Sequence, residues 1–230
     1  MNARVDHLVI VADTLEQGAR WCEATLGVTP VGGGRHPRMG THNRLLSIGA
    51  ERFPDCYLEI IAIDPDAPAP GRPRWMGIDD AVQRAAVRES PRLVHVVART
   101  PMIEMLRWGL INCGLNPGEP IAAERQTSDG VLRWRITVRD DGRAECAGAL
   151  PTLIEWQGAH PCARLPASPV ALRELTLRGV PQRALDVLKL PAVQALPASV
   201  GAAALSATFD TPRGAVTLHS WTAGAGEEIR

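Results

Sequence analysis

Apolar positions in the first third of the chain follow the two periods that distinguish strands from helices. Residues 5–12 (V-D-H-L-V-I-V-A) form an apolar run that predicts a strand. Four residues of the next segment recur at helical spacing: Leu15, Ala19, Cys22 and Leu26. We expect Asp13-Thr14 to cap this helix and Gly27 to end it. Three further strands are predicted, a short one near 29–31 and longer ones at 43–48 and 57–63. The order of this region is therefore βαβββ.

The same pattern restarts in the middle of the chain. Residues 92–99 predict a strand, and Thr100-Pro101 is expected to open a helix. Strands are predicted again at 132–138 and 150–156. Aligning Thr14 with Thr100 relates the two regions as an internal repeat.

The remaining segments connect and extend these two units. The proline-rich stretch at 64–73 reads as a linker, and a short helix is predicted after Asp79-Asp80. The residues from 166 onward predict a strand, a short helix and a hairpin. We therefore divide the chain into four parts: a first βαβββ module at 1–65, a linker with a short helix at 66–91, a second βαβββ module at 92–160, and a reduced third unit, a βαββ extension packed on the same domain, at 161–230. The fold class is α+β.

Two acidic residues lie inside apolar strands at matching points of the repeat. They are Glu59 and Glu155. A lone carboxylate among apolar residues is costly unless something pairs with it. The repeat therefore suggests that both acids line one shared site.

Histidines on the first strand of each unit are candidates to join these acids. His7 shares a strand face with Val9, and it converges with Glu59 if the two strands are neighbours. Imidazole and carboxylate together suit a divalent ion such as Zn, Fe, Mn, Ni or Co. The alignment places Leu93 opposite His7, with His95 two residues further on the same face. The candidate metal ligands are His7, Glu59, Glu155 and His95.

Two alternatives to a metal site stay open. A single strand histidine such as His95 is more often a satisfied core residue than a ligand. The acids also have arginines within reach in a polar cleft: Arg44, Arg133 and Arg135.

A second cluster of polar residues follows the first helix, between glycines that allow a close approach of the backbone to a ligand. Its candidate substrate-binding residues are Arg35, His36, His42 and Asn43. Such groups suit an anionic or carbonyl-bearing small molecule. A solvated loop is the alternative.

Composition and charge exclude several classes of function. Of the 230 residues, 45% are hydrophobic and 22% charged, and the formal net charge is zero, so no general attraction to nucleic acid or membrane is implied. No apolar stretch approaches the roughly 18–20 residues that span a bilayer. The first residues lack the basic start and apolar core of a secretory signal, so we expect a cytoplasmic location. Five widely spaced cysteines favour neither a disulfide framework nor structural zinc.

Three segments together resemble the vicinal oxygen chelate superfamily and, within it, the glyoxalase-like proteins. They are Asp6-His7-Leu8-Val9, the stretch from Gly33 to Asn43, and Tyr57-Leu58-Glu59-Ile60-Ile61-Ala62. The resemblance covers residues 4–65 closely and 92–157 loosely.

This resemblance implies a curved, open barrel-like mixed sheet made of paired βαβββ modules. It implies a divalent metal held by a first-strand histidine and a last-strand glutamate of each module. His7, Glu59 and Glu155 carry over to these positions, whereas Leu93 departs from the pattern. Members of the superfamily isomerise, open, epimerise or conjugate substrates that chelate the metal through two neighbouring oxygens, and some bind small molecules without a metal.

Two functional hypotheses follow. The first is a metal-dependent lyase, isomerase or dioxygenase-type enzyme in which Glu155 or Glu59 acts as the base on a small carbonyl or carboxylate substrate. The second is a metal-free protein that binds or sequesters a small molecule, which Leu93 favours. A homodimer is a further candidate partner, because the sequence does not show whether one chain completes the cleft.

Overall fold

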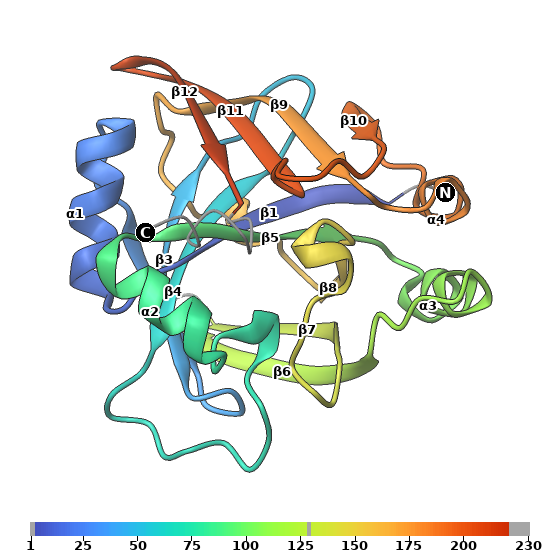
Figure 1. The fold of residues 1–230 in the computed structure, drawn as a ribbon. Coiled ribbons are helices and arrows are strands. Elements are labelled where there is room, and N and C mark those ends of the chain that lie inside the picture. The colour runs from blue at the N-terminus through green and yellow to red at the C-terminus, as the bar shows by residue number, and fades with distance from the viewer. Residues whose placement is uncertain (1–2, 128–129, 221–230) are drawn as a thin grey trace, which may run out of the picture.

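The computed structural model describes residues 3–127 and 130–220, which form two β-sheets with helices around them (Figure 1). The larger sheet has eight strands in the order β2-β3-β4-β1-β5-β8-β7-β6, and the smaller has four in the order β10-β9-β11-β12. The strands of the larger sheet are β1 (Arg4–Val11), β2 (Val31–His36), β3 (Thr41–Ser47), β4 (Tyr57–Ile63), β5 (Arg92–Arg99), β6 (Glu119–Thr127), β7 (Gly130–Val138) and β8 (Thr152–Gln157).

The smaller sheet and the helices complete the fold. The strands of the smaller sheet are β9 (Ala171–Arg178), β10 (Val193–Leu196), β11 (Leu205–Thr211) and β12 (Gly214–His219). The α-helices are α1 (Leu15–Leu26), α2 (Ala81–Glu89), α3 (Ile103–Asn112) and α4 (Gln182–Leu188). Short 3-10 helices are η1 (Trp75–Gly77), η2 (Glu145–Gly148) and η3 (Pro161–Ala163).

The larger sheet consists of two modules with the same order of elements. The first runs β1-α1-β2-β3-β4 and the second β5-α3-β6-β7-β8. Within each module the first strand pairs in parallel with the last, β1 with β4 and β5 with β8. The modules join at the centre of the sheet, where β1 and β5 pair antiparallel. This arrangement confirms the predicted α+β fold of paired βαβββ modules.

Helix α1 forms as the sequence predicts. The Thr14 hydroxyl accepts a hydrogen bond from the Gln17 N–H at 3.1 Å, and Gly27 ends the helix in the left-handed region at φ 77°. Gly18 allows the helix to approach the sheet closely, since a Cβ there would lie 2.4 Å from Ile60 Cγ2. The helix therefore packs directly on β4.

Several elements differ from the prediction. Helix α3 begins at Ile103 and not at Thr100, whose hydroxyl instead accepts from the Met102 N–H at 3.1 Å in the turn after β5. Strand β2 includes the glycine run and lies later than the short strand predicted near 29–31, and β6 is a strand that the sequence pattern does not predict. The later start of α3 shifts the true alignment of the two modules, which matters for the site.

Strand β1 divides the interior into two cores, because alternate side chains point to opposite faces of a sheet. Leu8 and Ile10 belong to an outer core that also includes residues of α1, α3 and the smaller sheet. Val9 and Val11 belong to an inner core with residues of β7 and β8. The inner face is the one that carries the site.

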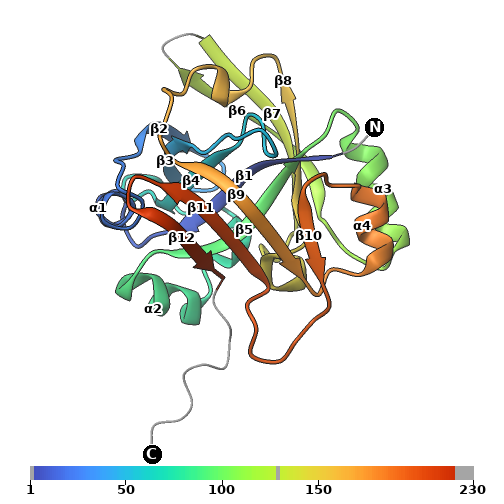
Figure 2. The same ribbon diagram turned by 90° about the horizontal axis from the view of Figure 1, so that it is seen from above.

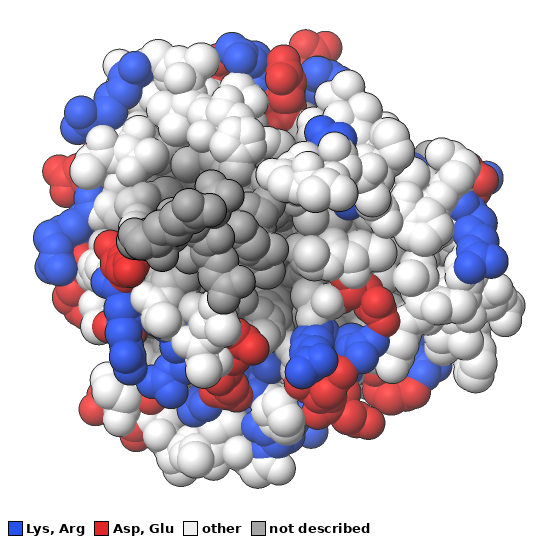
Figure 3. All heavy atoms as spheres, in the orientation of Figure 1, with Lys and Arg blue, Asp and Glu red and all other residues white. Residues whose placement is uncertain are grey.

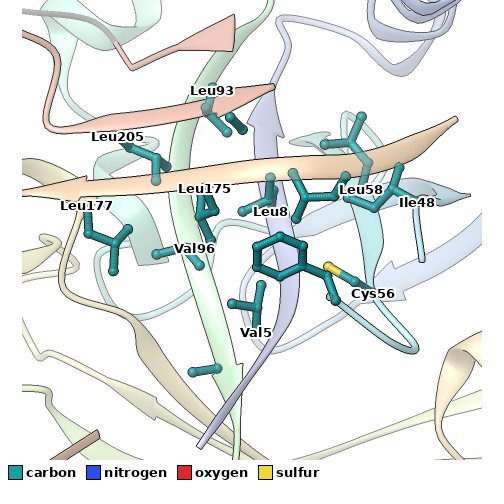
Figure 4. Close-up of a cluster of buried hydrophobic side chains, with 14 of the residues drawn as sticks. Val5, Leu8, Ile48, Cys56, Leu58, Leu93, Val96, Leu175, Leu177 and Leu205 are labelled. Atoms are coloured by element: carbon teal, nitrogen blue, oxygen red, sulfur yellow. The ribbon is translucent and has the colours of Figure 1, made fainter. Parts of the chain in front are cut away.

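The smaller sheet covers the outer face of the larger one (Figures 1 and 2). In Figure 4, Leu175, Leu177 and Leu205 of the smaller sheet lie beside Leu8 and Val96 of β1 and β5. The sequence predicts a βαββ unit here, but the described part of this region, which ends at residue 220, has the additional strand β10. Strand β10 pairs in parallel with β9.

The two edges of the larger sheet approach each other, so the sheet curls around its inner face. Strands β2 and β6 are in contact. The Arg38 guanidinium, in the turn after β2, donates to the Ala122 carbonyl of β6 at 2.7 Å. Both modules of one chain therefore enclose the space inside the curl.

Charged residues are spread over the surface without a dominant sign. Figure 3 shows basic and acidic side chains interspersed on one face, as the formal net charge of zero leads one to expect. None of the helices in residues 3–127 and 130–220 has the length and apolar character needed to cross a membrane.

Replacing Phe209 by alanine tests the contact between the two sheets. Phe209 is 0% exposed in the outer core, so Phe209→Ala is expected to lower the free energy of unfolding by about 3–5 kcal/mol, through lost burial and the cavity left behind. Denaturant unfolding followed by circular dichroism measures this. The control is Val200→Ala at a position 104% exposed, expected to change stability by less than about 0.5 kcal/mol. Equal stability of the two variants would show that Phe209 does not hold the sheets together.

Candidate active site

A narrow pocket lies inside the curled sheet and is lined by both modules. Its free volume is about 60 Å³, room for a few water molecules. The polar lining groups include His7, His36, Asn43, Glu59, His95 and Arg125. The aromatic walls are formed by Tyr57, Trp75, Trp134 and Trp156.

A β-bulge turns Asp6 toward this pocket. Between Val5 and His7 the register of β1 against β5 shifts, so that one extra residue, Asp6, is inserted on β1. Without the bulge, two successive residues would face opposite sides of the sheet. Asp6 is fully buried and accepts hydrogen bonds from His7 Nδ1 at 2.6 Å, Trp156 Nε1 at 3.0 Å and His160 Nε2 at 2.9 Å.

His7 lies between two carboxylates. Its Nδ1 faces Asp6, its Nε2 lies 3.5 Å from Glu59 Oε2, and its ring stacks on Tyr57 at 4.5 Å. Burial disfavours the charged imidazole, but the hydrogen bonds with Asp6 and Glu59 outweigh burial and raise the pKa of His7 to about 9. His7 is therefore an imidazolium at neutral pH in the metal-free protein.

Glu59 is buried and ionised. Burial disfavours its charge, yet the hydrogen bond and charge of His7 outweigh burial and lower the pKa of Glu59 to about 2. Asn43 Nδ2 donates to Glu59 Oε1 at 2.5 Å, while Asn43 Oδ1 accepts from the Gly34 N–H at 2.7 Å. These contacts fix the orientation of the Asn43 amide and hold the carboxylate in place.

His36 is a neutral member of the same cluster. Its Nδ1 lies 3.1 Å from the Thr41 hydroxyl, and its Nε2 lies 3.9 Å from Glu59 Oε1. Trp75 and Trp134 contact its ring edge-on, at 5.1 and 6.3 Å. Burial lowers the pKa of His36 to about 4, so it stays uncharged at neutral pH.

His95 takes the place of His7 in the second module. Each histidine lies eight residues before the first residue of the following helix, Leu15 or Ile103. His95 Nδ1 lies 2.9 Å from the Gly148 carbonyl, which only accepts, so Nδ1 carries the proton. Burial lowers the pKa of His95 to about 4 and keeps it neutral. The predicted match of Leu93 with His7 is therefore wrong.

The second module has a threonine where the first has a glutamate. Val9 pairs with Glu59, and Val97, the same distance after its histidine, pairs with Thr152. The Thr152 hydroxyl donates to His95 Nε2 at 2.8 Å, in place of the histidine–carboxylate contact of the first module.

Glu155 does not reach the pocket, and the prediction that it joins Glu59 there is wrong. Arg135 donates to Glu155 Oε2 at 2.7 and 2.9 Å, and it also donates to Glu104 of α3 at 3.1 Å. Trp156, the residue after Glu155, lines the pocket. Because successive strand residues face opposite sides of a sheet, Glu155 points to the other face. The alternative in which an arginine satisfies this acid is the one observed.

The predicted substrate-binding cluster divides between the two faces of β2 and β3. His36 and Asn43 line the pocket. Arg35 and His42 form a cross-strand pair outside it, near Asp64: Arg35 Nη1 lies 3.1 Å and His42 Nδ1 3.9 Å from its carboxylate. The structure therefore contradicts the expectation that these two residues contact a ligand in the pocket.

Three residues of the pocket network are missed by reasoning from sequence alone. Asp6 stands out in the sequence only as an acid in an apolar strand next to His7. The β-bulge that brings it to the site cannot be read from the sequence. His160 and Arg125 lie in segments without a periodic pattern. Nothing in the sequence marks them as neighbours of the site.

The donors in the pocket fit part of a divalent-metal site. A metal bound at about 2.0–2.2 Å to nitrogen and oxygen holds two adjacent ligands about 3–3.5 Å apart, and His7 Nε2 and Glu59 Oε2 are 3.5 Å apart. Asp6 behind His7 is the kind of outer carboxylate that orients a metal-binding imidazole. Within residues 3–127 and 130–220, no three His, Cys, Asp or Glu side chains are already gathered as a metal-binding group. A third nitrogen is available if His95 Nε2 leaves Thr152.

Comparison with known protein families shows which family the chain belongs to. A family model described as a glyoxalase-like domain matches residues 5–189, so the chain belongs to this glyoxalase-like family. The resemblance found in the sequence is thereby confirmed. No curated protein sequence matches the chain.

Solved structures align with the chain at low sequence identity. A hypothetical protein from Staphylococcus aureus aligns with a TM-score of 0.57 and 14% identity, over 96% of this chain and 87% of that one. A Streptomyces coelicolor methylmalonyl-CoA epimerase in complex with 2-nitronate-propionyl-CoA aligns with a TM-score of 0.43 and 15% identity, over 69% of this chain and 96% of that one. At 14% identity the similarity to the Staphylococcus aureus protein shows the fold and not the reaction.

Replacing Asp6 by asparagine tests the cause of the raised His7 pKa. Asp6→Asn removes a carboxylate that favours the imidazolium, while the burial that disfavours it remains. In chelator-treated protein, we expect the pKa of His7 to fall from about 9 toward or below its usual 6.5, as measured by imidazole titration in NMR spectra. Asp210→Asn, in the smaller sheet, should leave it unchanged. A His7 pKa near 9 in Asp6→Asn would contradict this account.

Proposed function

We propose that this glyoxalase-like protein is a divalent-metal-dependent lyase, isomerase or dioxygenase-type enzyme acting on a small substrate with two neighbouring oxygens. The observation that carries the proposal is Glu59, an ionised carboxylate 6% exposed at a pocket that also holds three histidines. A buried charge of this kind is rarely retained for stability alone, because well-packed apolar residues often serve as well. Perturbed acids in a pocket are accordingly candidates for chemistry.

The proposed metal ligands are His7 and Glu59, with His95 as the third. A metal bound there would act as a Lewis acid toward a carbonyl oxygen. The Asp6 carboxylate accepts a hydrogen bond from the Nδ1–H of His7, so the Nε2 of His7 is directed at Glu59. His95 is held in the same way by Gly148, with its proton on Nδ1.

Glu59 is the proposed base. It takes the proton from the carbon next to the substrate carbonyl: the C–H bond breaks, an O–H bond forms on the carboxylate, and the electron pair moves toward the carbonyl oxygen. Asn43 holds Oε1, so Oε2 would be the oxygen that leaves the metal to receive this proton, while His7 keeps its place as a ligand. Returning the proton to a different position would complete an isomerisation.

The pocket favours exclusion of water from this step. Its walls are largely aromatic and aliphatic, and its free volume is about 60 Å³. A neighbouring cleft of about 530 Å³ shares His36, Trp75 and Trp134 with the pocket. We propose that the reacting head of the substrate occupies the pocket and that any larger remainder lies in this cleft.

A metal-free binding or sequestering protein is the second candidate. Thr152, which stands where a second acid would complete the ligand set, is the observation that favours it. A protein with this function would need the pocket but neither a metal nor a base.

Metal-dependent thermal stability distinguishes the two candidates. We expect zinc, manganese, nickel or iron to raise the melting temperature of the native protein by mass action, and Glu59→Gln to abolish most of this shift. The matched control is Glu155→Gln, which removes a strand carboxylate outside the pocket and should leave the metal shift intact. Absence of any shift in the native protein, together with less than about a tenth of a metal ion per chain, would favour the metal-free candidate.

Hydrogen exchange tests the proposed base. In deuterated water, the metal-loaded protein is expected to exchange the proton next to the carbonyl of its substrate, screened from a panel of small 2-oxo and 2-hydroxy compounds by proton NMR. Glu59→Gln removes both the base and a metal ligand and should slow this exchange by at least about 10²-fold, while Glu155→Gln exchanges at the native rate. Native exchange rates in Glu59→Gln would assign the base to another residue.

A further inference from the structure

Arg125 is a half-buried cation at the pocket, where the charge of Glu59 acts on it from beyond ion-pair distance. Its side chain comes from β6, the edge strand of the second module, and lines the pocket beside residues of the first module. Its hydrogen bond in the described part of the chain is from Nη1 to Asn43 Oδ1, at 3.3 Å. No carboxylate of the described residues forms an ion pair with it, and its buried Nε has no partner. Buried charges are normally paired, so this arginine has room for an anion.

A second arginine at the pocket shows the contrast. Arg139 also lines the pocket, but Asp141 binds its guanidinium at 2.6 Å and Glu145 binds it as well. A third arginine at the pocket, Arg143, is exposed to solvent, so among the described residues Arg125 is the half-buried arginine of the pocket that lacks an ion pair. Trp75 adds a second unpaired donor, since its buried Nε1–H has no hydrogen-bond partner among the described residues.

The glycine run of β2 accommodates this side chain. A Cβ at Gly34 would lie 2.1 Å from Arg125 Cδ and 2.9 Å from its Nε, so only glycine leaves space for the arginine. A Cβ at Gly33 would lie 2.1 Å from Asn43 Oδ1. Gly32, on the same strand, has nothing within 4 Å of a Cβ position. Gly33 and Gly34 therefore leave space for polar side chains of the site, Asn43 and Arg125.

We infer that Arg125 is the anchor for a carboxylate of the substrate, so that the pocket takes a small anionic 2-oxo or 2-hydroxy acid. A guanidinium presents two parallel N–H groups that match the two oxygens of a carboxylate. Asn43 connects the two ends of the site, with Oδ1 on Arg125 and Nδ2 on Glu59. Because one amide contacts both residues, a substrate whose carboxylate binds Arg125 would lie on the side of the pocket that holds the proposed base. This assignment rests on the proposed function of the pocket and adds the charge and class of its substrate.

Binding of pyruvate to chelator-treated protein tests the inference separately from metal binding and catalysis. Binding is followed through the indole N–H signals in proton–nitrogen NMR spectra, with the Trp75 signal assigned by Trp75→Phe. We expect the Trp75 signal to shift on saturation with pyruvate, and neutral methyl pyruvate to bind at least about tenfold more weakly, a difference of about 1.4 kcal/mol.

Two variants remove or displace the Arg125 guanidinium, and a third variant serves as the matched control. Arg125→Met keeps the length of the side chain without the charge, and Gly34→Ala displaces the arginine through its new methyl group. Both are expected to weaken pyruvate binding at least tenfold, whereas Gly32→Ala binds as the native protein does.

Three results would overturn the assignment: native affinity for pyruvate in Arg125→Met, equal affinity of the native protein for pyruvate and its methyl ester, or binding of inorganic phosphate in preference to pyruvate. Failure of the proposed function has a different signature, which is an unchanged metal shift in Glu59→Gln. Arg125→Met should retain the native metal shift, so the two outcomes are independent.

Discussion

An imidazolium held between two buried carboxylates is the interaction on which the pocket depends. Asp6, His7 and Glu59 form a row of alternating charge, and each member would be costly to bury without its neighbour. The bulge in β1 brings Asp6 and His7, two successive residues, to the same side of the sheet. The register of β1 with β4 then brings Glu59 to the other nitrogen. Backbone irregularity and strand pairing thus combine to assemble one charged group.

The two modules share a fold but divide the chemistry between them. The first module supplies the charged histidine–glutamate pair, whereas the corresponding His95 and Thr152 are neutral and satisfied by each other. The second module contributes its charge from a different strand, through Arg125 on β6. The two modules can differ at this position without leaving a buried group unsatisfied, because the Thr152 hydroxyl bonds to the histidine in place of a carboxylate.

Sequence reasoning succeeds where one local signal fixes the structure. Caps and period define α1, and alternation places His7 beside Glu59 once β1 and β4 are neighbours. It fails where an offset of one or two residues decides the result. Because α3 begins at Ile103, the repeat alignment on Thr100 is two residues out, which hides the match of His95 with His7. Glu155 is assigned to the wrong face for a separate reason, because it is one residue out of phase with Ile154 and Trp156, which line the pocket. No local pattern encodes such an offset.

Contacts between sequence-distant edge strands are equally invisible in the chain. Strand β6 carries few of the alternating apolar residues that mark a strand, and the glycines of β2 read as a loop. Only the curled sheet shows that Arg125 crosses Gly34.

The meeting of β2 and β6 has a consequence for how the protein works in solution. Arg38 joins these two edges within a single chain by its hydrogen bond to β6. The residues that line the pocket therefore belong to the same polypeptide. Dilution to nanomolar levels would leave these walls of the cavity in place.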